Sequence, residues 1–273
     1  MVTTRTRRTT AAAAAVVAAG AALHAAPAVL TLRPPRMRWA PARAGMGRPD
    51  HIALTFDDGP DPEGTPAIME QLDRLRWQAT FFLLGSMVRA YPSIAADLVA
   101  AGHEVAVHGD SHRSHLWLTL PQAMADVRRG RDVVADAAGV DPRWFRPPYG
   151  TLSGPALAAG RAAGLRTVLW TAWGRDWRAR ATPAGIADTV MAQLTPGGTI
   201  LLHDSDCTSA PGSWKTTLGA LPILAERLAG HGLSVGPLSH HGIDPGIMAS
   251  TPGATDQEPG RAPPAGPERT GRR

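Results

Sequence analysis

Cysteine and lysine are nearly absent from this chain of 273 residues. The single cysteine, Cys207, excludes an intrachain disulfide and any zinc or iron–sulfur site that needs several cysteines. Any bound metal must therefore be held by nitrogen and oxygen ligands. The length and the apolar content of 44% suffice for one large folded domain, which excludes a wholly disordered or fibrous protein.

An excess of basic over acidic residues is missing from most of the chain, although the formal net charge is +5. Residues 1–50 carry eight arginines against one aspartate, whereas residues 51–243 carry a net charge of −2. Lys215 is the only lysine, so arginine sets the pI of about 10.5. A DNA-binding face would show basic residues clustered on the folded domain. Because the body is slightly acidic, the sequence predicts no nucleic-acid partner.

Residues 11–32 form the only long uncharged apolar run, and three arginines precede it as in a signal peptide or membrane anchor. Five more arginines follow within residues 33–48, which opposes translocation of that flank. Two interpretations stay open. The run either takes the protein to the cell envelope or outside the cell, with membrane contact through this segment, or it is the poorly ordered leader of a cytoplasmic protein.

From residue 51 onward, short apolar runs alternate with helical segments. Thr65-Pro66 and Thr182-Pro183 are helix-start signals, and Thr119 with Gln122 forms a capping-box pair. This order of elements predicts an α/β fold with a parallel sheet covered by helices, either open or closed into a barrel. The strands are predicted at 51–57, 79–84, 103–108, 166–170, 198–203 and 233–235.

Three regions follow from these patterns. We expect a leader over residues 1–50, one folded domain over 51–243, and a tail over 244–273. The tail is rich in Pro, Gly, Arg and Thr, which predicts disorder. We expect the protein to be a monomer.

Chemically useful side chains follow the ends of several predicted strands. In folds with parallel strands and covering helices, active sites lie beyond the carboxyl ends of the strands. The residues at these ends are Asp57, Asp58, His108, Asp176 and His203.

Asp58, His108 and His112 are candidate ligands for one metal ion. The two histidines are spaced i, i+4, and Zn²⁺ accepts two imidazoles and one carboxylate while leaving a position for water. Asp57 is then the natural base and His203 the natural acid. Taken singly, the acidic pair at 57–58 is also good turn chemistry, and a histidine pair is as often part of a solvated loop.

Arg146 opens the stiff segment 146–150, where it could keep a neighbouring carboxylate ionised and oriented. Taken alone, this segment would be interpreted as a proline-rich connector.

Five motifs stand in order along the chain. They are Thr55-Phe56-Asp57-Asp58-Gly59-Pro60, His108-Gly109-Asp110-Ser111-His112, Arg146-Pro147-Pro148-Tyr149-Gly150, Asp176-Trp177 and Leu201-Leu202-His203. Together they resemble the motifs of the polysaccharide deacetylases, the NodB-homology family of carbohydrate esterases. The resemblance spans about residues 51–240 and implies the family's distorted (β/α) barrel. It also implies metal-dependent hydrolysis of an N-acetyl group from an N-acetylglucosamine-containing glycan, with release of acetate.

The resemblance also implies a role for each matching residue. Asp57 resembles the base, Arg146 the arginine that supports it, and His203 the acid. Asp176 resembles the acidic partner of this network, and either His203 or Arg146 could be its contact. The metal ligands would be Asp58, His108 and His112, with zinc expected and cobalt, nickel or manganese as alternatives. Tyr149 would supply a backbone N–H to the oxyanion, while Trp177 and Leu201 would wall the acetyl methyl group.

Two positions depart from the family's pattern. Trp173 occupies a place that is often Asp or Asn, which puts secondary hydrogen bonds in doubt. Gly109 replaces a hydroxyl that steadies the loop after the first metal-binding histidine, and we expect little cost to the chemistry.

Several further residues lie in loops near the predicted site. Trp117, Trp173 and Trp214 could stack on sugar faces, although packing is the commoner role of tryptophan. Cys207 follows His203 closely, and a plain loop or buried thiol is the favoured interpretation. Asp204 and Asp206 are expected to cap or brace this loop.

The leading hypothesis is therefore an N-deacetylase of cell-wall or chitin-type glycans. An O-acetyl esterase or small-amide hydrolase on the same fold is an alternative, because the same groups serve both reactions. A catalytically silent glycan-binding module is a third hypothesis, which the intact set of ligands, base and acid disfavours.

Overall fold

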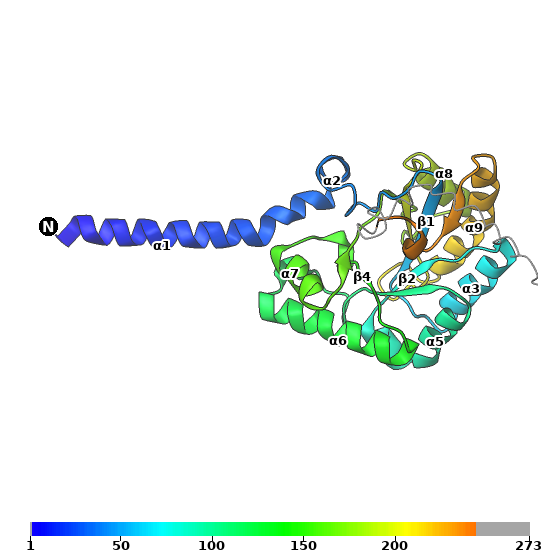
Figure 1. The fold of residues 1–273 in the computed structure, drawn as a ribbon, viewed down its shortest axis with the longest axis horizontal. Coiled ribbons are helices and arrows are strands. Elements are labelled where there is room, and N and C mark those ends of the chain that lie inside the picture. The colour runs from blue at the N-terminus through cyan, green and yellow to red at the C-terminus, as the bar shows by residue number, and fades with distance from the viewer. Residues whose placement is uncertain (1, 244–273) are drawn as a thin grey trace, which may run out of the picture.

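Parallel strands run through the centre of residues 2–243, the part of the chain that the computed structural model describes (Figure 1). Neighbouring strands pair in the order β5-β4-β3-β2-β1-β7-β6, and β8 pairs with the start of β1. The strands are β1 His51–Asp57, β2 Thr80–Leu83, β3 Glu104–Val107, β4 Trp144–Phe145, β5 Arg166–Thr167, β6 Ala172–Trp173, β7 Thr199–His203 and β8 Ser234–Gly236.

Helices cover the outer face of this curved sheet (Figure 1). Each connects two parallel strands, which is why strands and helices alternate along the chain. The helices of the body are α3 Gly64–Leu75, α4 Gly85–Ala90, α5 Pro92–Ala100, α6 Leu120–Ala138, α7 Gly154–Ala162, α8 Pro183–Met191 and α9 Ser213–Ala229. Short 3₁₀ turns are η2 His115–Trp117, η3 Pro148–Gly150 and η4 Leu238–His240.

Strand β1 is buried on both faces, as a central parallel strand must be. Its outward side chains, including Ile52 and Phe56, pack against the helices in the largest apolar cluster. Its inward side chain Ala53 packs in a second cluster with Phe82 and Trp144 inside the curved sheet. The expectation of a distorted (β/α) barrel is confirmed.

The predicted strand over 166–170 is wrong in its extent. The chain pairs only over β5, leaves the sheet, and pairs again over β6. The carbonyl groups of Val168 and Leu169 accept hydrogen bonds from the Arg146 side chain instead of a neighbouring strand. A side chain distant in the sequence therefore ends this strand. The two-residue strand β4 was not predicted.

Two expected helix starts are confirmed in detail. Thr119 and Gln122 form the predicted capping box at the start of α6. The Thr182 hydroxyl accepts a hydrogen bond from the Gly185 amide at the start of α8. Thr65 lies in the first turn of α3.

The N-terminal segment is helical and then packs on the body. Helix α1 (Val2–Ala25) projects away from the body, and the short elements η1 (Ala26–Thr31) and α2 (Arg33–Trp39) follow it (Figure 1). Within the described residues, one helical stretch, Ala14–Thr31, is long and apolar enough to cross a membrane. The predicted division at residue 50 stays a prediction, although Arg36 and Ala44 are buried against the body. The predicted disordered tail lies outside the described residues.

Helix α6 packs closely on the loop that follows β3. A Cβ atom added at Gly130 would lie 2.5 Å from the carbonyl oxygen of Gly109 and 2.9 Å from the amide nitrogen of Asp110. The absence of a side chain at Gly130 thus lets the helix approach the backbone of this loop.

We expect Gly130→Ala to lower the free energy of unfolding by about 1–3 kcal/mol, because the added methyl group overpacks rigid backbone. Gly230→Ala is the matched control, since Gly230 has φ −73° and no neighbour within 4 Å of an added Cβ. Urea unfolding measures both. Equal stability of the two variants would contradict the close packing of α6.

Candidate active site

Four strands deliver polar side chains to one end of the barrel. Asp57 ends β1, His108 follows β3, Arg146 follows β4, and His203 ends β7. Because all the strands are parallel, their carboxyl ends lie on the same side. The structure brings these residues together as the sequence predicts.

Asp58, His108 and His112 form a compact set of metal donors. The Asp58 Oδ1 atom lies 3.3 Å from Nε2 of His108 and 3.3 Å from Nε2 of His112. One ligand atom from each residue lies within 4.8 Å of the others. Asp58 has φ 79°, which turns its side chain away from the direction of β1 and toward the two histidines.

This donor set fits a divalent cation. Asp58 Oδ1 is buried and has no hydrogen-bond partner among the described residues, which is costly unless a cation faces it. In a tetrahedral zinc site with bonds of about 2.0–2.1 Å, ligand atoms are separated by about 3.3 Å. The separations between Asp58 and the two histidines match that geometry.

The protonation states also suit metal binding. Burial favours a higher pKa for Asp58, but the contact with His108 and the nearby His203 and His112 outweigh burial and lower that pKa. Burial and the neighbouring His108 lower the pKa of His112 to about 4. At neutral pH the carboxylate is therefore ionised and the His112 imidazole is neutral, as ligands must be.

Hydrogen bonds orient two of these ligands. His108 Nδ1 donates to the carbonyl oxygen of Arg146 over 2.8 Å, which leaves the lone pair on Nε2 for a metal. The Thr208 hydroxyl donates to Asp58 Oδ2 over 2.5 Å. Sequence reasoning missed Thr208, because it lies 150 residues from Asp58 and carries no motif signal.

Asp126 of α6 braces the loop between His108 and His112. Its carboxylate accepts hydrogen bonds from the Asp110 amide, the Ser111 hydroxyl and His115 Nε2. A Cβ atom at Gly109 would lie 2.7 Å from Asp126 Oδ2. Gly109, with φ 94°, thus makes room for a carboxylate that supports the loop in place of a hydroxyl.

The Arg146 guanidinium group is fully buried beside Asp57. Its Nη1 atom donates to Asp57 Oδ1 over 2.7 Å and to the Thr55 hydroxyl over 2.9 Å. Its Nη2 atom donates to the carbonyl oxygen of Leu169. The other Asp57 oxygen, Oδ2, lies 3.8 Å from His108 Nε2. Arg146 therefore fixes one carboxylate oxygen and leaves the second beside the metal ligands.

Asp176 contacts His203 rather than Arg146, which answers the question that the sequence left open. Asp176 Oδ1 accepts a hydrogen bond from His203 Nδ1 over 2.9 Å, and Oδ2 accepts from the His203 amide and the Thr217 hydroxyl. Burial lowers the pKa of His203, but the Asp176 carboxylate outweighs it and raises the pKa to about 10. His203 is therefore protonated at neutral pH.

A cavity of about 230 Å³ connects these groups. The predicted residues Tyr149, Trp177 and Leu201 line it. The other predicted site residues in its lining are Asp57, Asp58, His108, His112 and His203. Tyr149 has φ 60°, and its ring packs edge-on against His112. The lining also includes Gly150, Trp170, Trp173, Thr208 and Ser209.

Trp173 reaches the cavity, whereas Trp117 and Trp214 are absent from its lining within residues 2–243. Trp117 is 82% exposed on η2, and Lys215 lies over the Trp214 ring. Sequence spacing could not show which of these tryptophans lines the cavity, because each lies in a different part of the chain and only the tertiary structure sets its direction.

The loop after His203 is braced by its acidic residues, as expected. Asp204 accepts a hydrogen bond from the Thr65 hydroxyl, and burial raises the pKa of Asp204 to about 7. Asp206 accepts from the Gly212 amide. The Cys207 thiol donates to the carbonyl oxygen of Asp58, and burial raises its pKa to about 12. Cys207 is exposed and is therefore a loop residue rather than a buried thiol.

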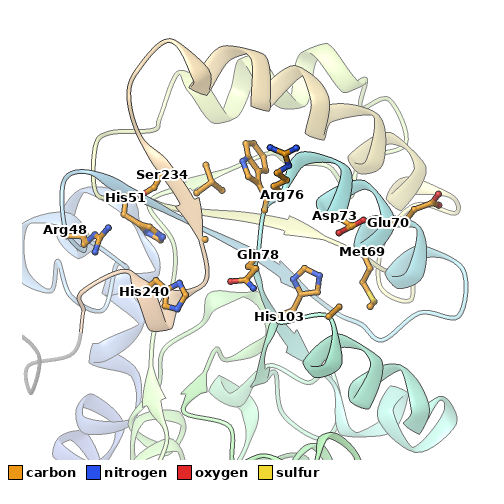
Figure 2. Close-up of a pocket in the computed structure, with 14 residues that line it drawn as sticks. Arg48, His51, Met69, Glu70, Asp73, Arg76, Gln78, His103, Ser234 and His240 are labelled. Atoms are coloured by element: carbon orange, nitrogen blue, oxygen red, sulfur yellow. The ribbon is translucent and has the colours of Figure 1, made fainter.

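A larger cavity of about 760 Å³ lies at the opposite end of the barrel, where the strands begin (Figure 2). His51, Gln78 and His103 line it from the starts of β1, β2 and β3. Burial lowers the pKa values of His51 and His103 to about 4, so both rings are neutral. None of the predicted site residues lines this cavity.

Known proteins resemble this chain in sequence and in fold. Residues 44–168 match the family described as Polysaccharide deacetylase. The chain is 36% identical over 196 residues to a chitooligosaccharide deacetylase of Bradyrhizobium sp. (strain ANU 289), which covers 68% of this chain and 88% of that protein. It is 36% identical over 159 residues to the peptidoglycan-N-acetylmuramic acid deacetylase PdaC of Bacillus subtilis (strain 168), covering 58% of this chain and 33% of that protein.

A solved structure agrees with these sequence comparisons. The family 4 carbohydrate esterase from Streptomyces lividans, in complex with acetate, superposes with a TM-score of 0.61 at 32% identity, covering 68% of this chain and 92% of that chain. This chain therefore belongs to the polysaccharide deacetylase family of metal-dependent carbohydrate esterases.

Proposed function

We propose that this protein removes N-acetyl groups from an N-acetylglucosamine-containing glycan of the peptidoglycan or chitin type and releases acetate. One observation carries the proposal: the metal donors, a carboxylate base and a protonated histidine line one small cavity with apolar walls. The names of the relatives, which are chitooligosaccharide and peptidoglycan deacetylases, support this substrate class. A silent glycan-binding module would not need all three kinds of group.

Asp58, His108 and His112 would hold the metal ion, and we assign zinc because two imidazoles and one carboxylate are a common zinc donor set. When bound, such a cation lowers the pKa of a water molecule and polarises the acetyl carbonyl group. The remaining steps depend on the chain's own side chains.

Asp57 acts as the general base. Its Oδ1 atom is held by Arg146, so Oδ2 is the atom free to accept a proton from the attacking water. The buried guanidinium group holds this carboxylate in a fixed orientation. The Tyr149 backbone N–H would stabilise the oxyanion of the tetrahedral intermediate, an interaction typically worth about 3 kcal/mol of barrier lowering.

His203 acts as the general acid that protonates the leaving amine. Its Nδ1 atom is occupied by Asp176, so Nε2 is the atom that donates the proton. Trp177 and Leu201 wall the acetyl methyl group, and Trp170 extends this apolar wall. An acetyl group is small, which suits a cavity of about 230 Å³.

We also propose that the apolar stretch Ala14–Thr31 places the protein at the cell envelope as a membrane-inserted segment. Its length and composition support insertion. The helix that contains most of this stretch projects from the body, so it is free to enter a bilayer (Figure 1).

The test of the proposed activity is acetate release from N-acetylglucosamine oligomers, measured before and after chelation and after return of zinc. We expect loss of activity on chelation and recovery with zinc. Activity that survives complete metal removal, checked by elemental analysis, would contradict the proposed mechanism. An O-acetylated xylan oligomer assayed in parallel distinguishes ester from amide hydrolysis.

Substitutions should separate chemistry from metal binding. Asp57→Asn should lower kcat by at least about 10²-fold and keep bound zinc near one per chain, because it removes the base and no ligand. His108→Ala should lose the zinc as well as the activity. Zinc content and kcat measured on the same preparations check both. A wild-type rate in Asp57→Asn would disprove the assignment of the base.

The pH dependence of kcat/KM should depend on the contact between His203 and Asp176. The acid must be protonated, so kcat/KM falls as the pH rises through the pKa of His203. Asp176→Asn removes the charge that raises this pKa, while burial still lowers it. We expect the alkaline limb to move to lower pH by at least about one unit. A bound cation lowers the pKa in both proteins, so the comparison is between profiles at saturating zinc. An unmoved limb would refute the role of the pair.

A further inference from the structure

Trp117 is unusual because it is a large apolar side chain that is 82% exposed and lies outside the active-site cavity. It belongs to η2, directly beside the place where α1 meets the body. His24 Nε2 is 2.7 Å from the carbonyl oxygen of Leu116, the residue before Trp117. The carbonyl oxygen of Leu23 approaches Gly154 of α7 so closely that an added Cβ would lie 2.5 Å away.

Other exposed apolar side chains surround this junction. Leu23 of α1 is 76% exposed, and Leu120 and Met124, one turn apart on α6, are 45% and 42% exposed. Met124 also lines a shallow cavity between α6 and α7 whose other lining residues are alanines and Arg128. We call the surface formed by Leu23, Trp117, Leu120 and Met124 the α1-exit face.

The charge around the α1-exit face has one sign. Residues 1–49, 111–125 and 142–175 contain no aspartate or glutamate, although the whole chain has 23 acidic residues. These segments supply the N-terminal helix, η2, the start of α6, and α7. Arg113 is exposed in the loop before η2, and the exposed Arg128 of α6 lines the cavity between α6 and α7 together with Met124. The face therefore combines apolar side chains with positive charge and without acidic groups.

The apolar stretch of the N-terminal segment overlaps its contact with the body. The stretch extends to Thr31, but the contacts with Leu116 and Gly154 begin at His24 and Leu23. The Thr31 hydroxyl in turn donates to the carbonyl oxygen of Gly150. A bilayer that takes up Ala14–Thr31 must therefore meet the surface of the body beside this contact.

We propose that the α1-exit face lies on the surface of an anionic phospholipid bilayer. Trp117 and the adjacent apolar side chains enter the interfacial layer, where tryptophan is favoured, while Arg113 and Arg128 face the anionic headgroups. This inference rests on the membrane insertion proposed for Ala14–Thr31, and it adds a surface of the catalytic body to that contact. Because Thr31 contacts Gly150, which lines the active-site cavity, the cavity is held close to the membrane surface.

The test uses the full chain reconstituted into phosphatidylglycerol–phosphatidylcholine vesicles that carry lipids brominated near the headgroup. Bromine quenches tryptophan fluorescence only at short range. All proteins compared carry Trp39→Phe, because Trp39 is 66% exposed and closely follows the membrane-inserted stretch. On this background, we expect Trp117→Phe to remove most of the quenchable signal. Trp77→Phe is the matched control, because Trp77 lines the cavity at the opposite end of the barrel, and this variant should keep the signal.

Each other outcome of this experiment leads to a different conclusion. Vesicle association with unchanged quenching in Trp117→Phe would overturn the α1-exit face and leave the membrane insertion standing. Failure of the wild-type chain to associate would overturn both. Equal quenching in vesicles of phosphatidylcholine alone would refute the role of Arg113 and Arg128 and overturn the proposal of an anionic surface. Binding to soluble polyphosphate without vesicle association would point to an anionic wall polymer instead and overturn the proposal.

Catalysis provides the separate control. Trp117→Ser should deacetylate soluble N-acetylglucosamine oligomers at the wild-type rate, because Trp117 does not line the cavity. Loss of activity in every protein, the wild type included, would refute the proposed function without touching the lipid result.

Discussion

The buried guanidinium of Arg146 is the group on which the rest of the site depends. Burying a charged group costs free energy unless hydrogen bonds and an opposite charge compensate the loss of solvent. Asp57, Thr55 and the carbonyl groups of Val168 and Leu169 supply that compensation. The same residue's own carbonyl oxygen orients His108. One residue therefore holds the proposed base Asp57, the proposed metal ligand His108 and the backbone between β5 and β6 in place.

Around this centre, each reactive group has a partner that fixes which of its atoms faces the cavity. Asp176 occupies Nδ1 of His203, and Arg146 occupies Oδ1 of Asp57. Asp126 holds the loop that ends in His112, and Gly130 lets α6 approach that loop. The site thus holds an ionised Asp58, a neutral His112 and a protonated His203 within one cavity at neutral pH, because different neighbours oppose or reinforce the effect of burial at each group.

Sequence patterns predicted the elements whose signals are local. Strand β1 and the capped start of α6 follow from a continuous apolar run and from Thr119 with Gln122. The ends of β5 and the short β4 were not predictable, because the Arg146 side chain takes carbonyl groups that a longer strand would use. Thr208, Asp126 and Trp170 carry no local signal of function, since only packing brings them to the site.

The sequence by itself predicted which polar groups meet at the site, because Asp57, Asp58, His108 and His203 stand at or directly after strand ends, and strand ends converge in any parallel sheet. His112 follows His108 at a spacing of four residues. The sequence also determined that any metal has only nitrogen and oxygen ligands, since Cys207 is alone. Tertiary structure alone decided that Asp176 pairs with His203, that Trp173 enters the cavity, and that Trp117 lies beside α1. These outcomes depend on the direction of side chains from separate loops, which packing sets and sequence spacing does not.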